Sequence, residues 1–164
     1  MKYSDIYLVN HDVDWFSLVN GVYIHVASAG GVIPDFVNDD EQLRIVQHQV
    51  EMLPFIYGED EIEFNDVAIQ NVLGDNNSRA RLSYIESFKV MAQKGFFSYD
   101  RTNIGEPLDN RYHLVCRPLH PDQQPQVLNL PVFDTEISIL EWIRNVTRSN
   151  EEQSQVFGCK RDGQ

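Results

Sequence analysis

Two aspartates and a histidine near the start of the chain could do chemistry together. Asp12 and Asp14 precede a β-prone run, and His25 lies on the next such run. Carboxylates and imidazoles bind divalent metals and transfer protons. Here they would share a surface of two strands, which supplies three ligands at most and no partners to orient them. We therefore predict a surface His–Asp pair with no metal, no cofactor and no turnover.

A second group of residues that could do chemistry follows directly in the sequence. His25-Val-Ala-Ser28-Ala-Gly30-Gly31 ends a β-prone run in a loop with two glycines. Such a loop could present backbone N–H groups to an anion or expose Ser28 as a nucleophile. It lacks the G-x-S-x-G pattern of a nucleophile elbow, and paired glycines also simply release a chain from a strand. A small hydrolase or metal enzyme at these residues is therefore our third-ranked function, and we expect no catalysis.

A β-hairpin must position these residues. Asn20-Gly21 separates two β-prone runs, and Asn-Gly favours a tight type I′ turn between paired strands. We predict a hairpin over about residues 13–28, with one largely apolar face packed on the core. The expected cross-strand pairs are Val19 with Val22, Ser17 with Ile24, and Trp15 with Val26. A further strand at residues 6–9 could pair beside it.

Later segments alternate between helical and strand patterns. Asp39 or Asp40 can cap a helix that ends before Pro54, and shorter apolar stripes predict helices at about 65–73 and 79–94. Residues 96–101 and 111–117 read as strands joined by a long polar loop. A proline-rich segment at 118–131 leads to a last helix that begins at Asp134 or Thr135 and ends near residue 150.

The order of these elements resembles the winged helix-turn-helix family. The resemblance covers about residues 39–117 and rests on FNDVAIQNVLG, DNNS, RARLSYIESFKVMAQKG, FFSYDR and RYHLVCRP. It implies that the helix at 79–94 would enter the major groove of duplex DNA and that the hairpin would touch the backbone. The residues implied at bases are Arg79, Arg81, Ser83 and Ser87, and those implied at phosphates are Lys94, Arg101 and Arg111. The alternative for each arginine is a solvated surface position.

The distribution of charge supports two different partners. The net charge is −12, yet residues 78–117 carry seven Lys and Arg against four Asp and Glu, which gives +3 there and −15 elsewhere. The basic segment coincides with the expected DNA contacts, so a non-catalytic DNA-binding regulator is our first-ranked function. The second is an acidic interaction module that binds a basic protein, with the acidic run at 59–63 as its densest charge.

The bulk composition predicts a single compact α+β protein. Apolar residues make up 42% and charged residues 23%, as in ordinary globular proteins. No run approaches the roughly 20 apolar residues that a membrane span needs, and Cys116 and Cys159 have no second cysteine at metal-ligand spacing. We expect a cytoplasmic protein that does not bind membranes. The predicted parts are an N-terminal hairpin at 1–37, a winged-helix core at 38–117, a crossing segment and C-terminal helix at 118–150 that could form a homodimer, and a tail at 151–164.

Overall fold

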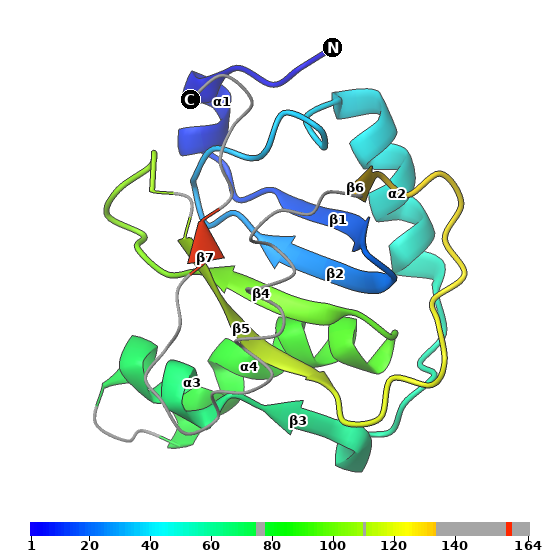
Figure 1. Cartoon of the computed structure of the whole chain (residues 1–164). Coiled ribbons are helices and arrows are strands. Elements are labelled where there is room, and N and C mark those ends of the chain that lie inside the picture. Colours follow the sequence, from blue (N-terminus) through cyan, green and yellow to red (C-terminus); the bar gives the residue numbers. More distant parts are fainter. Residues whose placement is uncertain (75–77, 110, 134–156, 159–164) are drawn as a thin grey trace.

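The computed structural model describes residues 1–74, 78–109, 111–133 and 157–158 (Figure 1). It has the predicted α+β architecture, in which helices pack on one mixed sheet. The helices are α1 (Asp5–Val9), α2 (Asp40–Met52), the 3-10 turn η1 (Glu59–Glu61), α3 (Asp66–Leu73) and α4 (Ser78–Gln93). The strands are β1 (Asp14–Val19), β2 (Val22–Ala27), β3 (Ile62–Phe64), β4 (Phe97–Arg101), β5 (Arg111–Pro118), β6 (Val132–Phe133) and β7 (Phe157–Gly158).

The sheet includes strands from the N-terminal and the C-terminal parts of the chain. Its strand order is β3-β5-β4-β2-β1-β6, and β7 pairs with β5. The pairs β2–β4 and β1–β6 are parallel, and the others are antiparallel. Because β2 lies beside β4, the N-terminal hairpin and the later hairpin form one continuous surface.

The N-terminal hairpin forms as predicted. Asn20 and Gly21 adopt positive φ values of 47° and 83°, which are the values that a type I′ turn needs at its two central residues. Trp15 pairs with Val26 and Val19 pairs with Val22, so the register is the one expected from the sequence. The prediction of a strand at residues 6–9 was wrong, because residues 5–9 form the helix α1. Ser4 caps α1 by accepting a hydrogen bond from the Tyr7 backbone N–H.

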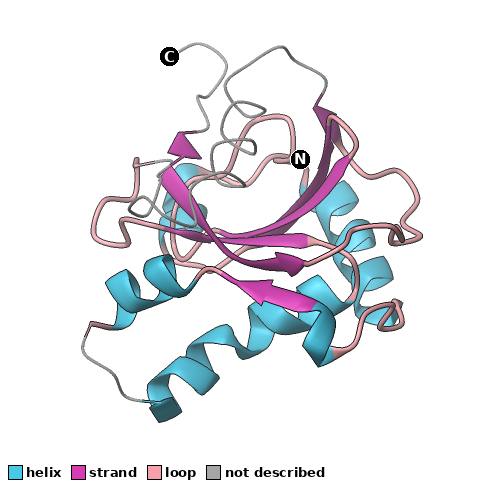
Figure 2. Cartoon of the chain, turned by 60° about the horizontal axis from the view of Figure 1, so that its bottom comes forward, coloured by secondary structure: helices cyan, strands magenta, loops and turns pink. Residues whose placement is uncertain are grey.

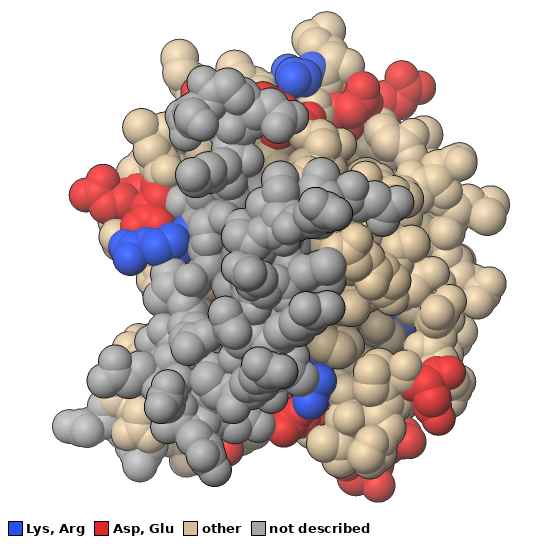
Figure 3. Space-filling view, viewed as in Figure 1, with Lys and Arg blue, Asp and Glu red and all other residues tan. Residues whose placement is uncertain are grey.

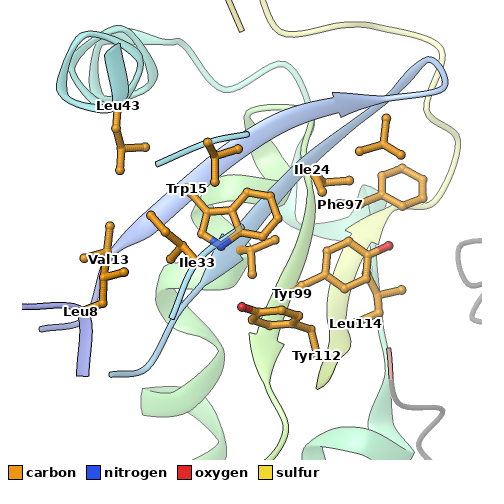
Figure 4. Packing of buried hydrophobic residues seen from close by; sticks show 13 residues of the cluster. Leu8, Val13, Trp15, Ile24, Ile33, Leu43, Phe97, Tyr99, Tyr112 and Leu114 are labelled. Atoms are coloured by element: carbon orange, nitrogen blue, oxygen red, sulfur yellow. The ribbon is translucent and has the colours of Figure 1, made fainter. Parts of the chain in front are cut away.

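The two faces of the sheet bury different side chains. One face holds a large apolar cluster around Trp15, Tyr99 and Tyr112, which α1 and the loop after β2 cover (Figure 4). The opposite face packs against α2, α3 and α4, with Phe16 beside Val46 of α2. Figure 2 shows the longest helices along this side of the sheet. Since strand side chains alternate between faces, β1, β2 and β5 contribute apolar side chains to both layers.

The helices between the hairpins begin and end close to their predicted bounds. Asp39 caps α2 and Asn65 caps α3, each accepting a hydrogen bond from a backbone N–H in the first turn. Gly74 ends α3 with a φ of 68°. The strands predicted as a wing, β4 and β5, are interior strands of the sheet, whereas a wing projects as a separate hairpin. From α2 to β5 the three helices and two strands follow the predicted order, but η1 and β3 lie between α2 and α3, where the sequence predicted only a connector. Helix α2 packs on β1.

The end of the chain is described only in part. Residues 119–131 run from β5 past α2, where Gln49 and Leu128 exchange hydrogen bonds, and then reach β6. The predicted C-terminal helix, its proposed role in a dimer, and most of the predicted tail lie outside the described residues.

Candidate functional site

A row of polar side chains crosses the helix-covered face of the sheet. Cross-strand pairing places His25 of β2 beside Ser98 of β4, and Asp100 of β4 beside His113 of β5. Asp14 of β1 extends the row at the hairpin. His25, Ser98, Asp100 and His113 are all buried. Buried polar groups are costly unless they are paired, so this row is the first place to look for chemistry.

The first part of the row has the residue types of a catalytic triad. The Ser98 hydroxyl lies 2.6 Å from His25 Nδ1, and His25 Nε2 lies 3.5 Å from Asp14 Oδ2. The hairpin thus brings His25 and Asp14 together, as its register requires. However, Ser98 is completely buried, beneath the side chains that pack on His25. A nucleophile must reach its substrate, so this arrangement of side chains has no access for acyl transfer.

The second part of the row is a network that the sequence analysis did not identify. The Tyr84 hydroxyl, from α4, lies 2.6 Å from Asp100 Oδ2 and 3.0 Å from His113 Nε2. His113 Nδ1 in turn lies 3.1 Å from the Thr102 hydroxyl. Asp100 Oδ1 accepts a hydrogen bond from the Arg101 backbone N–H. The only sequence signal for this network is alternation, which places Ser98 and Asp100 on the face opposite Phe97 and Tyr99.

Burial shifts the protonation of this network. It raises the pKa of Asp100 to about 6, although the hydrogen bonds from Tyr84 and the Arg101 backbone oppose the rise. It also lowers the pKa of His113 to about 4, so the imidazole is neutral at physiological pH. Burial and the neighbouring Asp100 raise the pKa of Tyr84, which keeps its hydroxyl protonated. At neutral pH the network therefore holds a buried Asp100 anion beside a neutral imidazole and a protonated tyrosine.

The loop after β2 is filled by an arginine side chain. Gly31 lies so close to Arg101 that a Cβ atom at position 31 would stand 1.3 Å from Arg101 Nη1. Arg101 donates to the Ser28 carbonyl at 3.4 Å and to the carbonyls of Glu106 and Asp109. The Ser28 hydroxyl is buried and accepts a hydrogen bond from the Val13 N–H at 2.7 Å. Neither the anion cradle nor the exposed nucleophile considered for this loop is present.

Asp12 supports the same loop and makes no cluster with Asp14 and His25. Its Oδ1 accepts a hydrogen bond from the Ala29 N–H at 2.8 Å and lies 3.5 Å from the Ser28 hydroxyl. Within the part of the chain that the structure describes, no group of three or more His, Cys, Asp or Glu side chains could hold a metal ion.

The residues implied at DNA fall into three groups. Arg79, Ser83 and Ser87 are exposed on α4. Arg81 and Arg111 form ion pairs with Asp66 and Asp109. The prediction that Lys94 and Arg101 face phosphates is wrong, because these side chains are buried, with exposed fractions of 8% and 1%.

The two buried cations are held by the protein itself. Lys94 Nζ donates to the carbonyls of Val50 and Glu51 at the end of α2, at 2.8 and 3.1 Å. Arg101 bonds three carbonyls, as described above. Neither side chain can reach a phosphate in this structure. The basic segment at 78–117 therefore presents less positive charge to solvent than its composition suggests.

Carboxylates neutralise many of the other described cations. Six lysines and arginines form ion pairs with carboxylates, namely Lys2, Arg44, Arg81, Lys89, Arg111 and Arg117. On the face seen in Figure 3, the described Lys and Arg side chains are scattered and do not gather into a patch. By contrast, exposed Glu41, Asp60 and Glu106 form no ion pair within the described ranges. Within the part of the chain that the structure describes, these carboxylates are available for long-range attraction of a cation.

A cavity opens between α2 and α4 above β1. It has a volume of about 490 Å³. Its walls combine carboxylates with apolar side chains and one buried lysine, and the lining residues are Asp12, Asp14, Phe16, Gln47, Val50, Glu51, Val90, Met91 and Lys94. These residues come from three segments far apart in the chain. Their meeting depends on how α2 and α4 pack on the sheet.

Comparison with known proteins adds no relative. No family model, curated protein or solved structure matches the chain. Among the described residues, no helix is both long and apolar enough to cross a membrane.

Proposed function

We propose that the protein is a non-catalytic interaction module whose acidic surface binds a basic protein partner. The carrying observation is the placement of charge. Among the described residues, Lys94 and Arg101 are buried and six further lysines and arginines pair with carboxylates, while Glu41, Asp60 and Glu106 stand exposed and form no ion pair. A net charge of −12 then gives a negative field that attracts positive partners and speeds their approach.

DNA binding falls to second place for a related reason. Of the residues implied at DNA, Lys94 and Arg101 are buried, and Arg81 and Arg111 are held in ion pairs with carboxylates. Binding to duplex DNA depends chiefly on cations that neutralise phosphates. The winged-helix resemblance of about residues 39–117 favours neither function, because winged helices also serve as protein-contact modules and a fold does not fix a function.

A selection experiment separates the two functions. The intact protein is immobilised and used to select binders from a random peptide library at low salt, and the frequency of Lys and Arg in the selected peptides is compared with the starting library. We expect clear enrichment of Lys and Arg. A random-sequence DNA duplex, tested by gel shift in the same buffer, should not be retarded. Peptides without basic enrichment would refute the proposal, and a retarded duplex would restore DNA binding to first place.

A further inference from the structure

The cavity between α2 and α4 has the chemistry to hold the side chain of a lysine or arginine. Phe16, Val50, Val90 and Met91 supply apolar walls, against which the aliphatic stem of a basic side chain can pack. Asp12, Asp14 and Glu51 supply carboxylates at the same cavity. All three are acceptors for an ammonium or guanidinium group, which forms strong charge-assisted hydrogen bonds.

The one cation in the lining does not cancel these carboxylates. Lys94 Nζ is bonded to two carbonyls at the carboxyl end of α2, where the negative end of the helix dipole stabilises its charge. Three carboxylates against one lysine leave the cavity with a net charge of −2. A cation is therefore the complementary ligand.

His25 provides a second and independent indication of a ligand. It is 1% exposed, and its Nε2 has no hydrogen-bond partner among the described residues. This nitrogen points toward Asp14 Oδ2, 3.5 Å away, and Asp14 lines the cavity. Because the Ser98 hydroxyl can donate to Nδ1 or accept from it, Nε2 is either a donor 3.5 Å from Asp14 Oδ2 or an acceptor that faces that oxygen. In either tautomer the contact is long, and a donor group bound at Asp14 would give its carboxylate a closer partner than His25.

We propose that this cavity is the anchor site for a Lys or Arg side chain of the basic partner, with Asp14 as its principal contact. The inference rests on the proposed function and adds a location to it. The acidic surface attracts the partner from a distance, and the cavity holds one side chain in place. Well-packed pockets that receive a single arginine or aromatic side chain carry much of the affinity in many protein interfaces.

The test is an NMR titration of the full-length protein with acetyl-lysine amide. Its neutral counterpart is acetyl-norleucine amide, which has the same apolar stem and no charge. We expect the lysine compound to shift the methyl signals of Val90 and Met91 and the side-chain amide of Gln47. The norleucine compound should shift them much less. Equal shifts with both compounds, or shifts that lie outside the cavity, would overturn the inference.

Two variants separate the cavity from general charge. Asp14→Asn removes one cavity carboxylate without changing its size, and we expect binding of acetyl-lysine amide to weaken about fivefold, as for loss of a half-buried charged hydrogen bond. Glu86→Gln makes the same charge change on an exposed position of α4, outside the cavity, and should leave binding unchanged. Equal weakening in both variants would reject the cavity as the site. If the library still yields basic peptides while Asp14→Asn binds them normally, the acidic module stands and only the anchor site fails.

Discussion

Asp100 is a carboxylate that the fold buries at a cost, so its replacement by asparagine should stabilise the protein at neutral pH. Its side chain accepts hydrogen bonds from Tyr84 and from the Arg101 backbone. An asparagine can keep the second bond with its oxygen and donate to the Tyr84 hydroxyl with its NH₂ group. Tyr84 can then donate to His113 Nε2, and His113 Nδ1 can donate to Thr102, so that every partner stays satisfied.

The expected gain follows from proton linkage. The pKa of Asp100 is about 6 in the folded protein against 3.8 for an ordinary aspartate, so the folded state binds the proton more tightly. This residue therefore lowers the free energy of unfolding as pH rises from about 4 to 6, and the full cost of about 3 kcal/mol persists above pH 6. Asp100→Asn removes that cost. The gain should approach about 3 kcal/mol at pH 7.5 and become small near pH 4.

The assay is urea unfolding of both proteins at several pH values between about 4 and 7.5, with the free energies of unfolding compared. Asp60→Asn is the matched control, because Asp60 is exposed and its replacement should change stability little at any pH. If Asp100→Asn is less stable than the wild type at pH 7.5, or if its gain does not depend on pH, the reasoning about buried charge is wrong.

Two further predictions concern His113 and the packing around Gly31. Burial lowers the pKa of His113 to about 4 against an ordinary 6.5, so the free energy of unfolding falls by about 3 kcal/mol as pH drops from about 6.5 to 4. His113→Gln should abolish this loss of stability, and urea unfolding at pH 7 and pH 4 measures it. Gly31→Ala should destabilise by about 1–3 kcal/mol, because the new Cβ collides with the buried Arg101 guanidinium. Gly21→Ala should cost only about 1 kcal/mol, since position 21 has a φ of 83° but open space around it, and thermal melts that rank these two variants in the opposite order would contradict the packing described here.

Local chemistry explains which parts of the fold could be predicted from the sequence. The Asn20-Gly21 turn fixed the hairpin and its register, and side-chain caps such as Asp39 marked the helix starts. Helix α1 was not predicted, because its residues are also β-prone. In the structure, the rings of Tyr3, Tyr7 and His11 stack along one side of this helix. Strand β3 was not predicted either, because a three-residue strand is defined only by its distant partner β5.

The site was harder to predict because it depends on long-range pairing. Lys94 and Arg101 were predicted to face phosphates because the winged-helix resemblance implies those positions. Alternation offered a warning for Arg101, which shares a strand face with buried Phe97 and Tyr99. Nothing local indicated that the end of α2 would present carbonyls to Lys94. The cavity lining likewise comes from segments that meet only when β1, α2 and α4 pack together.

The most direct test of an acidic interaction module is the salt dependence of its association rate. The strongest peptide from the library selection is mixed with the intact protein in a stopped-flow instrument, and the ionic strength is raised from about 0.01 to 0.15 M, which shortens the screening length from about 30 to 8 Å. We predict that the association rate constant falls about tenfold or more, while the dissociation rate changes far less. An association rate that does not change with salt, or one that rises, would contradict the claim that the acidic surface attracts the partner.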